Sequence, residues 1–311
     1  NDWALQYVEQ GLLFDWKSYV DKDEELLKNM YPGVIENWQI NGKMGGVPGM
    51  LNCYGVFYNK KMFQDAGLPL PAIGWTLDDL LAASSKFAKK EANVYGLYYP
   101  PYAGFAPFFV SIYGVSAGGQ PFANGIVNVT QTTADDQFKG IVQKIAEKMQ
   151  DGSIQPPTST GEGIENLFLQ GQIAMLQHGQ WFADALIRTA PKDLEWGFAP
   201  NPTVQTQSMI YDCVGWSSPA TIKNPDAVFK VLKFLDTEMY KTVIPQTPVA
   251  PPAYQPAAAA YFDTLKNAGH AEMAEALDYM LKSPDKQPVR FQQVWAGKAN
   301  KFLDAQWNNI I

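Results

Sequence analysis

Residue types that build metal and cofactor sites are scarce in this sequence. Its 311 residues include two histidines and two cysteines, too few for a cysteine-based zinc cluster. Cys53 and Cys213 lie far apart in the sequence, and we expect them to be buried free thiols. No His-x-x-x-His or histidine–carboxylate spacing is present, and no Walker loop. We therefore expect neither a metal nor a cofactor.

Positive charge is also scarce. The chain has 24 Lys and Arg against 31 Asp and Glu, a net charge of −7, and no basic run that could neutralise a nucleic-acid backbone. No stretch approaches the ~20 consecutive apolar residues that a membrane-spanning helix needs. We therefore expect neither nucleic acid as a partner nor a membrane-spanning helix in this sequence.

Aromatic residues, in contrast, are abundant. They form 13% of the sequence and include nine Trp and 15 Tyr, which suits a wet binding cleft because these side chains combine an apolar face with a polar group. Trp181 follows Gly179 by two residues, Trp216 follows Gly215 directly, and Tyr54 flanks an apolar strand. Each aromatic alone is more often part of a core. Several together, beside polar residues, favour a ligand platform.

Strand and helix signals alternate along the chain, which indicates an α/β architecture. Short apolar strands are expected within 43–59, 196–202 and 209–221, each bounded by Gly or Pro. The Pro/Ala-rich segment 247–260 is expected to be a surface connection. The length allows two domains.

Three helices carry recognisable start signals. Thr76 and Asp79 form a capping box, and Thr133 with Asp136 repeats the same spacing. Asn224 caps a third helix that has Pro225 at its first position. In that third helix the spacing predicts a buried stripe of apolar residues, which comprises Val228, Val231, Leu232 and Leu235.

Catalysis has no positive signal in the sequence. Residues 114–118 match the Gly-x-Ser-x-Gly pattern around Ser116, but turn-forming residues follow where a nucleophile elbow requires a helix. His178 is interpreted as a support and His270 as solvated at a helix start. The carboxylates Glu162, Glu165 and Asp212 lie near aromatic segments, but Glu162 and Glu165 are better explained as the start of a helix. We expect no catalytic residue.

Three motifs, in order, resemble those of the extracellular solute-binding proteins of bacterial ABC importers, in the sugar-binding group that includes maltose-binding protein. The first is NGKMGGVPGMLNCYGVFYNKKMFQDAGLPLPAIGWTLDDLL. The second is FLQGQIAMLQHGQW, and the third is VGWSSPATIKNPDAVFKVLKFL. The resemblance covers nearly the whole chain.

This resemblance implies an α/β, two-lobe periplasmic-binding-protein fold with an interlobe cleft, here without the family's N-terminal strands and last C-terminal helices. Residues 1–50 and 218–250 would belong to the N-terminal lobe and 51–217 to the C-terminal lobe. Residues 251–311 would form helices that dock mainly on the C-terminal lobe. The strands that cross between the lobes would lie near 48–54 and 212–217.

Carried over residue by residue, the resemblance also implies a set of ligand-binding positions. Trp181 matches the aromatic platform of the second motif, and Asp212 would accept hydrogen bonds from sugar hydroxyls. The full set is Asn1, Asp2, Trp3, Tyr54, Phe105, Trp181, Asp212, Gly215, Trp216 and Trp295.

The implied function is that of a substrate-binding component, not an enzyme. It would capture a mono- or oligosaccharide in the cleft and deliver it to membrane permease subunits. The protein would be an extracytoplasmic monomer, in the periplasm or as a cell-surface lipoprotein whose lipid anchor is absent from this chain. Two alternatives stay open: a glycoside-active enzyme with a similar cleft, and an importer protein for a non-sugar solute.

Overall fold

The computed structural model describes residues 2–99, 108–119, 131–155, 163–284 and 286–288, with positions 298, 301–302 and 305–306; for residues 2, 3 and 288 it describes the backbone only. The strands are β1 (Gln39–Ile40), β2 (Lys43–Met44), β3 (Val47–Asn59), β4 (Tyr95–Tyr98), β5 (Ile154–Gln155), β6 (Ile173–Gly179), β7 (Trp196–Pro200), β8 (Ile210–Trp216) and β9 (Gln287–Pro288).

Helices alternate with these strands, as the sequence predicts. They are α1 (Asp2–Glu9), α2 (Lys17–Val20), α3 (Glu24–Asn29), α4 (Lys60–Asp65), α5 (Leu77–Phe87), α8 (Asp136–Gln150), α9 (Ile164–Leu169), α10 (Phe182–Thr189), α11 (Pro225–Phe234), α12 (Tyr240–Val243), α13 (Gln255–Asn267) and α14 (Ala271–Lys282). Short 3₁₀ turns η1 (Glu36–Trp38) and η2 (Lys90–Ala92) and π-helical turns η3 (Val110–Gly114) and η4 (Leu235–Met239) are also present.

Helix caps agree with the sequence prediction in two cases and differ in one. The capping box of Thr76 and Asp79 starts α5, and the Asn224 side chain accepts a hydrogen bond from Ala227 N at the start of α11. The start predicted at Thr133 is wrong. Asp135 caps α8, because its carboxylate accepts two backbone N–H groups of the first turn.

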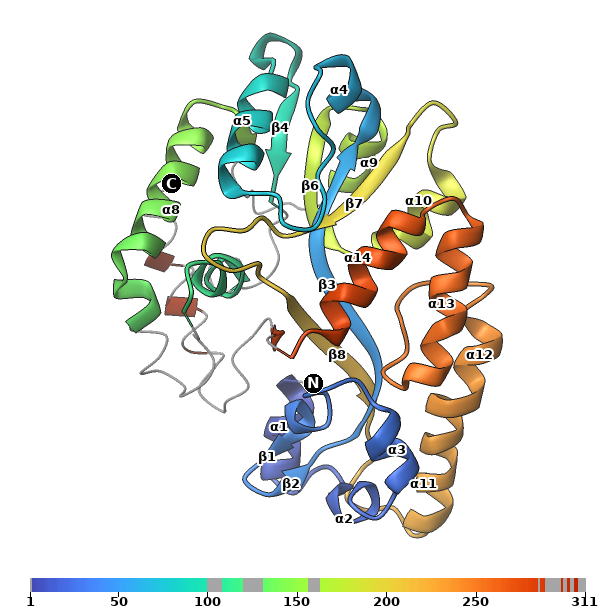
Figure 1. Ribbon diagram of the computed structural model, residues 1–311. Coiled ribbons are helices and arrows are strands. Elements are labelled where there is room, and N and C mark those ends of the chain that lie inside the picture. The colour runs from blue at the N-terminus through green and yellow to red at the C-terminus, as the bar shows by residue number, and fades with distance from the viewer. Residues whose placement is uncertain are drawn as a thin grey trace.

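Strand β3 connects the lower and upper parts of the molecule (Figure 1). Residues 47–53 pair antiparallel with β8, and residues 54–59 pair antiparallel with β6 and β7. The sheet order is β5-β4-β6-β3-β8-β9, with β7 also on β3. The two segments expected to cross between lobes, near 48–54 and 212–217, are therefore direct partners in one sheet.

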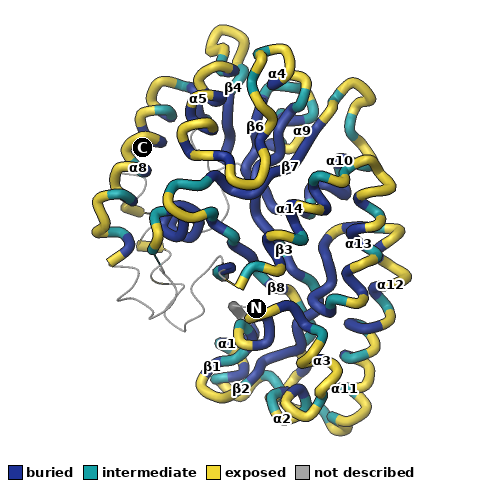
Figure 2. Tube along the Cα trace, viewed as in Figure 1, coloured by how far each residue is buried: buried dark blue, intermediate teal, exposed yellow. Residues whose placement is uncertain are grey.

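The two faces of β3 belong to two separate cores. Leu51, Cys53 and Phe57 face one cluster, which includes residues of α13 and α14, whereas Val56 and Tyr58 face another with residues of α5 and α8. Side chains alternate between the faces of a strand, so a strand covered on both faces has to be apolar at successive positions. Figure 2 shows β3 as a largely buried strand that runs through the molecule.

Two predictions about apolar segments fail for packing reasons. The segment 247–260 is not simply a surface connection, because its second half starts α13 and residues such as Ala253 and Ala257 are fully buried. In the α11 stripe, Leu232 is buried, but Val231 is 56% exposed. The buried face of α11 is therefore narrower than the spacing of its apolar residues predicts.

Candidate functional site

Trp181 lies in the turn between β6 and α10, and its indole ring packs against the backbone at Gly179. A Cβ atom at Gly179 would come within 1.9 to 2.3 Å of three atoms of the indole six-membered ring. The ring also meets Tyr54 edge-on, with the centroids 5.4 Å apart. Trp181 stays partly exposed. The glycine two residues earlier is thus required by the close approach of the indole to the chain.

Tyr54 connects this indole to Asp212. The Tyr54 side chain is buried, and its hydroxyl donates a hydrogen bond of 2.7 Å to Asp212 Oδ2. Asn52, directly opposite Asp212 in the β3–β8 ladder, donates a hydrogen bond of 2.6 Å from its amide to Oδ1. Each carboxylate oxygen of Asp212 therefore has one donor, and its further lone pairs can accept hydrogen bonds from a ligand.

The burial pattern of β8 shows which of its faces a ligand can reach. Tyr211 and Cys213 are buried in the core, whereas Asp212 is partly exposed and Val214 is 42% exposed. This alternation places Asp212 on the accessible face of the strand. An accessible carboxylate with both oxygens held by fixed donors is a preorganised hydrogen-bond acceptor.

Trp216 lies at the end of β8 and contacts the π-helical turn η4. Its indole N–H donates a hydrogen bond of 2.8 Å to Asp236 Oδ1, and its ring stacks on Tyr240. Asp236 is fully buried. Burial raises the pKa of this carboxyl well above its usual value, and the hydrogen bond from Trp216 opposes the rise only in part. Trp216 is itself partly exposed.

Gly215 has a packing role that the sequence does not reveal. A Cβ atom there would lie 2.2 Å from the carbonyl oxygen of Val47 and 2.7 Å from the Trp38 ring. The residue therefore lets Trp38 pack closely against β8. Contact between Gly215 and a ligand stays a prediction.

The structure thus brings three of the predicted positions into one connected group, hereafter the Asp212 cluster: Tyr54, Trp181 and Asp212, together with Asn52. Trp216 and Gly215 lie further along the same strand, β8. The remaining predicted positions fall outside the described side chains, and these are Asn1, Asp2, Trp3, Phe105 and Trp295.

Sequence reasoning missed several residues that shape this cluster. Asn52 was absent from the prediction, although it alternates with Tyr54 along one strand. Phe108 packs edge-on against the Tyr54 ring. Gln180 fixes the turn before Trp181, because its side-chain oxygen accepts a hydrogen bond of 2.7 Å from Cys53 N. The strand pattern could have indicated Asn52, but nothing in the sequence indicates the Gln180 contact.

The residues weighed for catalysis have structural surroundings. Ser116 is fully buried, and its Oγ accepts the N–H of Val204 and lies within 3.1 Å of two carbonyl oxygens. It therefore tethers a loop. The expectation that His270 is solvated is wrong, because its ring stacks on Trp196 at 3.7 Å. Within the described residues, no group of three or more His, Cys, Asp or Glu side chains could hold a metal ion.

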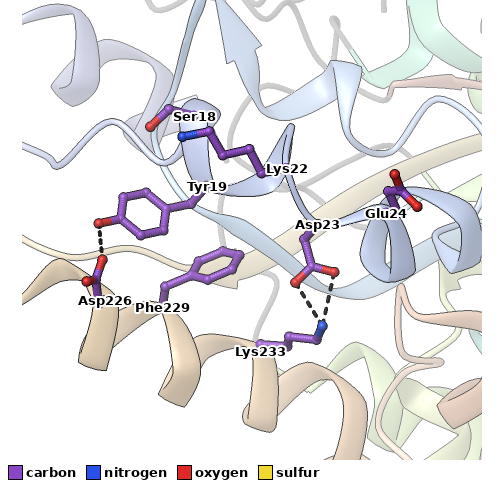
Figure 3. Close-up of a pocket in the computed structure, with 8 residues that line it drawn as sticks. All are labelled: Ser18, Tyr19, Lys22, Asp23, Glu24, Asp226, Phe229 and Lys233. Carbon is purple, nitrogen blue, oxygen red and sulfur yellow. Dashed lines mark hydrogen bonds and ion pairs between the residues drawn. The ribbon is translucent and has the colours of Figure 1, made fainter.

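A separate surface hollow lies between α2, the start of α3 and α11 (Figure 3). Most of its charged groups are already engaged. The Tyr19 hydroxyl donates to Asp226, and Lys233 pairs with Asp23. These pairs satisfy one another within the hollow. No helix of the described part is long and apolar enough to cross a membrane.

The chain belongs to the family of bacterial extracellular solute-binding proteins, whose family profile matches residues 1–242. Its fold is the two-lobe fold of these proteins. A substrate-binding protein of Listeria monocytogenes, solved in complex with cycloalternan, superposes with a TM-score of 0.77 at 21% identity, over 99% of this chain and 78% of that chain.

Curated relatives are also similar in sequence. A maltodextrin-binding protein of Bacillus subtilis is 25% identical over 318 residues, which cover 96% of this chain and 69% of that protein. A binding protein of Brucella abortus is 24% identical over 249 residues, 75% of this chain. That match spans 56% of the Brucella protein, so this chain corresponds to about half of the relative's length.

Proposed function

We propose that this chain captures a carbohydrate, a mono- or oligosaccharide, and delivers it to the membrane permease of an ABC importer. The Asp212 cluster carries the proposal. A pyranose has an apolar CH face and a rim of hydroxyls. The partly exposed Trp181 ring suits the face, and the Asp212 carboxylate suits the hydroxyls.

The lobes proposed for this action follow the chain order. Residues 1–50 and 218–250 form one lobe and 51–217 the other, with 251–311 docking mainly on the second. Ligand that contacts both lobes favours the closed arrangement, because it binds that arrangement more strongly than the open one. Family membership and the direct pairing of β3 with β8 support this assignment.

We propose a carrier role without turnover, which the described part of the same site supports. The cluster has one accessible carboxylate, whereas glycoside hydrolysis normally uses a pair. We propose that the protein works outside the cytoplasm as a monomer, in the periplasm or held at the cell surface by a lipid anchor, and hands its cargo on unchanged. The named ligands of the similar proteins, maltodextrin and cycloalternan, support a sugar as cargo.

Isothermal titration calorimetry with maltodextrins, cycloalternan, hexoses and sugar alcohols tests the proposal. We expect at least one sugar to bind the wild type. Asp212→Asn and Trp181→Ala should each weaken that binding by about tenfold or more, the effect of one hydrogen bond to a charged group or one aromatic contact. Lys61→Ala, an exposed change on α4, is the control and should bind as the wild type does.

The alternatives predict different results. Chromatography of the sugar after long incubation should recover it intact, and cleavage would favour a glycoside-active enzyme. Binding of no sugar, with a thermal shift on addition of a polyamine, peptide or phosphate ester, would favour an importer protein for another solute.

A further inference from the structure

Strand β3 changes its neighbours at residues 53 and 54, about half-way along its length (Figure 1). On one edge, Tyr54 is the last residue that pairs with β6, and the N–H of Leu51 already donates to the carbonyl oxygen of Pro251. On the other edge, β8 pairs with β3 up to Cys53, and β7 pairs with it from Gly55 onward. Buried backbone groups at such a change of partners need other hydrogen-bond partners.

The side chain of Gln180 binds β3 on the first of these edges. Gln180 is fully buried and follows Gly179, the last residue of β6. Its Oε1 accepts a hydrogen bond of 2.7 Å from Cys53 N, and its own backbone N–H donates one of 2.9 Å to the Cys53 carbonyl oxygen. Its Nε2 donates to the carbonyl oxygen of Leu51 at 3.3 Å. One glutamine thus continues the pairing of β6 with β3 beyond the end of β6.

The side chain of Asn201 binds β3 on the second edge. Asn201 follows the last residue of β7 and is also fully buried. Its Nδ2 donates a hydrogen bond of 2.9 Å to the carbonyl oxygen of Tyr54 and one of 3.5 Å to that of Ser208, which precedes β8. Because this side chain faces two carbonyl oxygens, its NH₂ group has to point toward them. Asn201 therefore connects the end of β7 and the approach to β8 with Tyr54.

Tyr54 lies where these two amides meet β3. Its hydroxyl donates to Asp212, and its ring meets Trp181. The direction of a side chain depends on the backbone that carries it, so hydrogen bonds that fix residues 53 and 54 also fix where the Tyr54 ring points. We propose that Gln180 and Asn201 are positioning residues for the Asp212 cluster, which hold the Tyr54 ring between the Asp212 carboxylate and the Trp181 indole. Their contribution to sugar binding rests on the proposed function.

Nuclear magnetic resonance of the ligand-free protein tests the positioning role without any sugar. The Trp181 indole N–H signal is assigned by its loss in Trp181→Phe. Asn201→Leu is the informative variant, because Asn201 acts on the indole through Tyr54, whereas Gln180 precedes Trp181 directly in the chain. We expect the signal to shift in Asn201→Leu, which removes the amide that donates to the Tyr54 carbonyl. If this variant does not fold, Asn201→Ser, which keeps a shorter donor, should give a smaller shift. An unchanged signal in the folded variant would overturn the proposal.

Hydrogen exchange measures the Gln180 contact directly. The Cys53 N–H donates to Gln180 Oε1, and an amide exchanges slowly only while its hydrogen bond stays closed. We expect this amide to exchange about three- to tenfold faster in Gln180→Met, the effect of one lost hydrogen bond. Gln180→Glu at about pH 5 should restore slow exchange, because a buried, protonated carboxyl can both accept and donate. Equally fast exchange in both variants would indicate a general loss of stability and contradict the role of Gln180.

The chain supplies a matched control in a second buried glutamine. Gln177 lies on β6, three residues before Gln180, and is 1% exposed, but its side-chain amide makes no hydrogen bond in the part of the chain that the structure describes. Gln177→Met therefore removes a buried amide without removing a contact to β3. We expect the Trp181 signal and the Cys53 exchange rate to stay as in the wild type. Changes as large as those in Asn201→Leu and Gln180→Met would overturn the proposal, because the loss of any buried amide would then cause them.

Calorimetry with a maltodextrin separates this inference from the proposed function. We expect Asn201→Leu to bind about three- to tenfold more weakly than the wild type, the effect of one hydrogen bond. Ile145→Val, a truncation in the core on α8, should lower the urea midpoint of unfolding but bind as the wild type does. Equal affinity in Asn201→Leu and the wild type would refute the effect on binding. If no sugar binds the wild type, but the Trp181 signal and the Cys53 exchange rate respond as described, the proposed function fails and the positioning role stands.

Discussion

The Tyr54 hydroxyl donates a hydrogen bond to the Asp212 carboxylate, although the two residues are 158 positions apart in the sequence. The same Tyr54 ring packs at 90° against the Trp181 indole. One buried side chain therefore fixes both the polar and the aromatic part of the candidate site. Changes at Tyr54 should affect sugar binding through both partners.

Tyr54→Phe tests the hydrogen bond between Tyr54 and Asp212 separately from the aromatic contact. The ring and its contact with Trp181 remain, but Asp212 loses one of its two donors. We expect the free energy of unfolding to fall by about 1 kcal/mol and sugar affinity to fall severalfold, as for one hydrogen bond. Urea unfolding and calorimetry measure these changes. Tyr58→Phe, on the same strand and packed on Phe63, is the control. An unchanged affinity in Tyr54→Phe would show that the Asp212 contact is irrelevant to binding.

Much of the fold could be predicted from local signals. The capping residues Thr76 and Asn224 mark real helix starts, because a cap depends on neighbours three residues away. Predictions failed where tertiary packing decides. Val231 matches the helical spacing but faces outward. The segment that looks like a linker contains Ala253, Ala257 and Ala258, which are buried in the core with residues of α13 and α14.

From the sequence, the site could be predicted only as a list of residues, without the contacts that connect them. The resemblance pointed to Trp181 and Asp212, but it gave no reason to join them, since their connection passes through the Tyr54 side chain. Asn52 was missed because its importance depends on the β3–β8 register, which places it opposite Asp212. A sequence shows which residues alternate on a strand, but it does not show which residue of a distant strand lies opposite.

Gly179→Ala should displace the Trp181 ring. The new methyl group would overlap the indole, which lies 1.9 to 2.3 Å from the Cβ position, and relieving such overlap typically costs about 1 to 3 kcal/mol. We expect lower stability, a changed Trp181 indole N–H signal in the nuclear magnetic resonance spectrum and weaker sugar binding. Gly140→Ala is the matched control: it lies in α8 with nothing within 4 Å, so alanine there should stabilise the protein by about 0.5 to 1 kcal/mol. A native Trp181 signal in Gly179→Ala would contradict the close packing described here.

Both cysteine thiols should be unreactive in the folded protein. The thiols of Cys53 and Cys213 are both buried, and burial raises the pKa of both, that of Cys213 to about 12. Since the thiolate is the reactive form, Ellman's reagent at about pH 8 should label neither thiol until urea unfolds the chain, and then both. Because the unfolded thiols ionise first, stability should also decline as pH rises above about 8.5. Rapid labelling of a folded thiol would contradict this burial.

Asp236 should make stability depend on pH in a way that Asp236→Asn removes. Its pKa is raised in the folded state by burial, so its contribution is fully present below the ordinary aspartate pKa and is lost as pH rises through the folded value. Asparagine keeps an oxygen that can accept the Trp216 indole N–H but does not ionise. We therefore expect Asp236→Asn to gain stability relative to the wild type as pH increases, as measured by thermal unfolding from about pH 4 to 8. Trp216→Phe removes the hydrogen bond that opposes the rise, so its stability should decline with pH over a wider range than in the wild type. Parallel pH profiles for the wild type and Asp236→Asn would mean that Asp236 does not titrate differently in the folded and unfolded states.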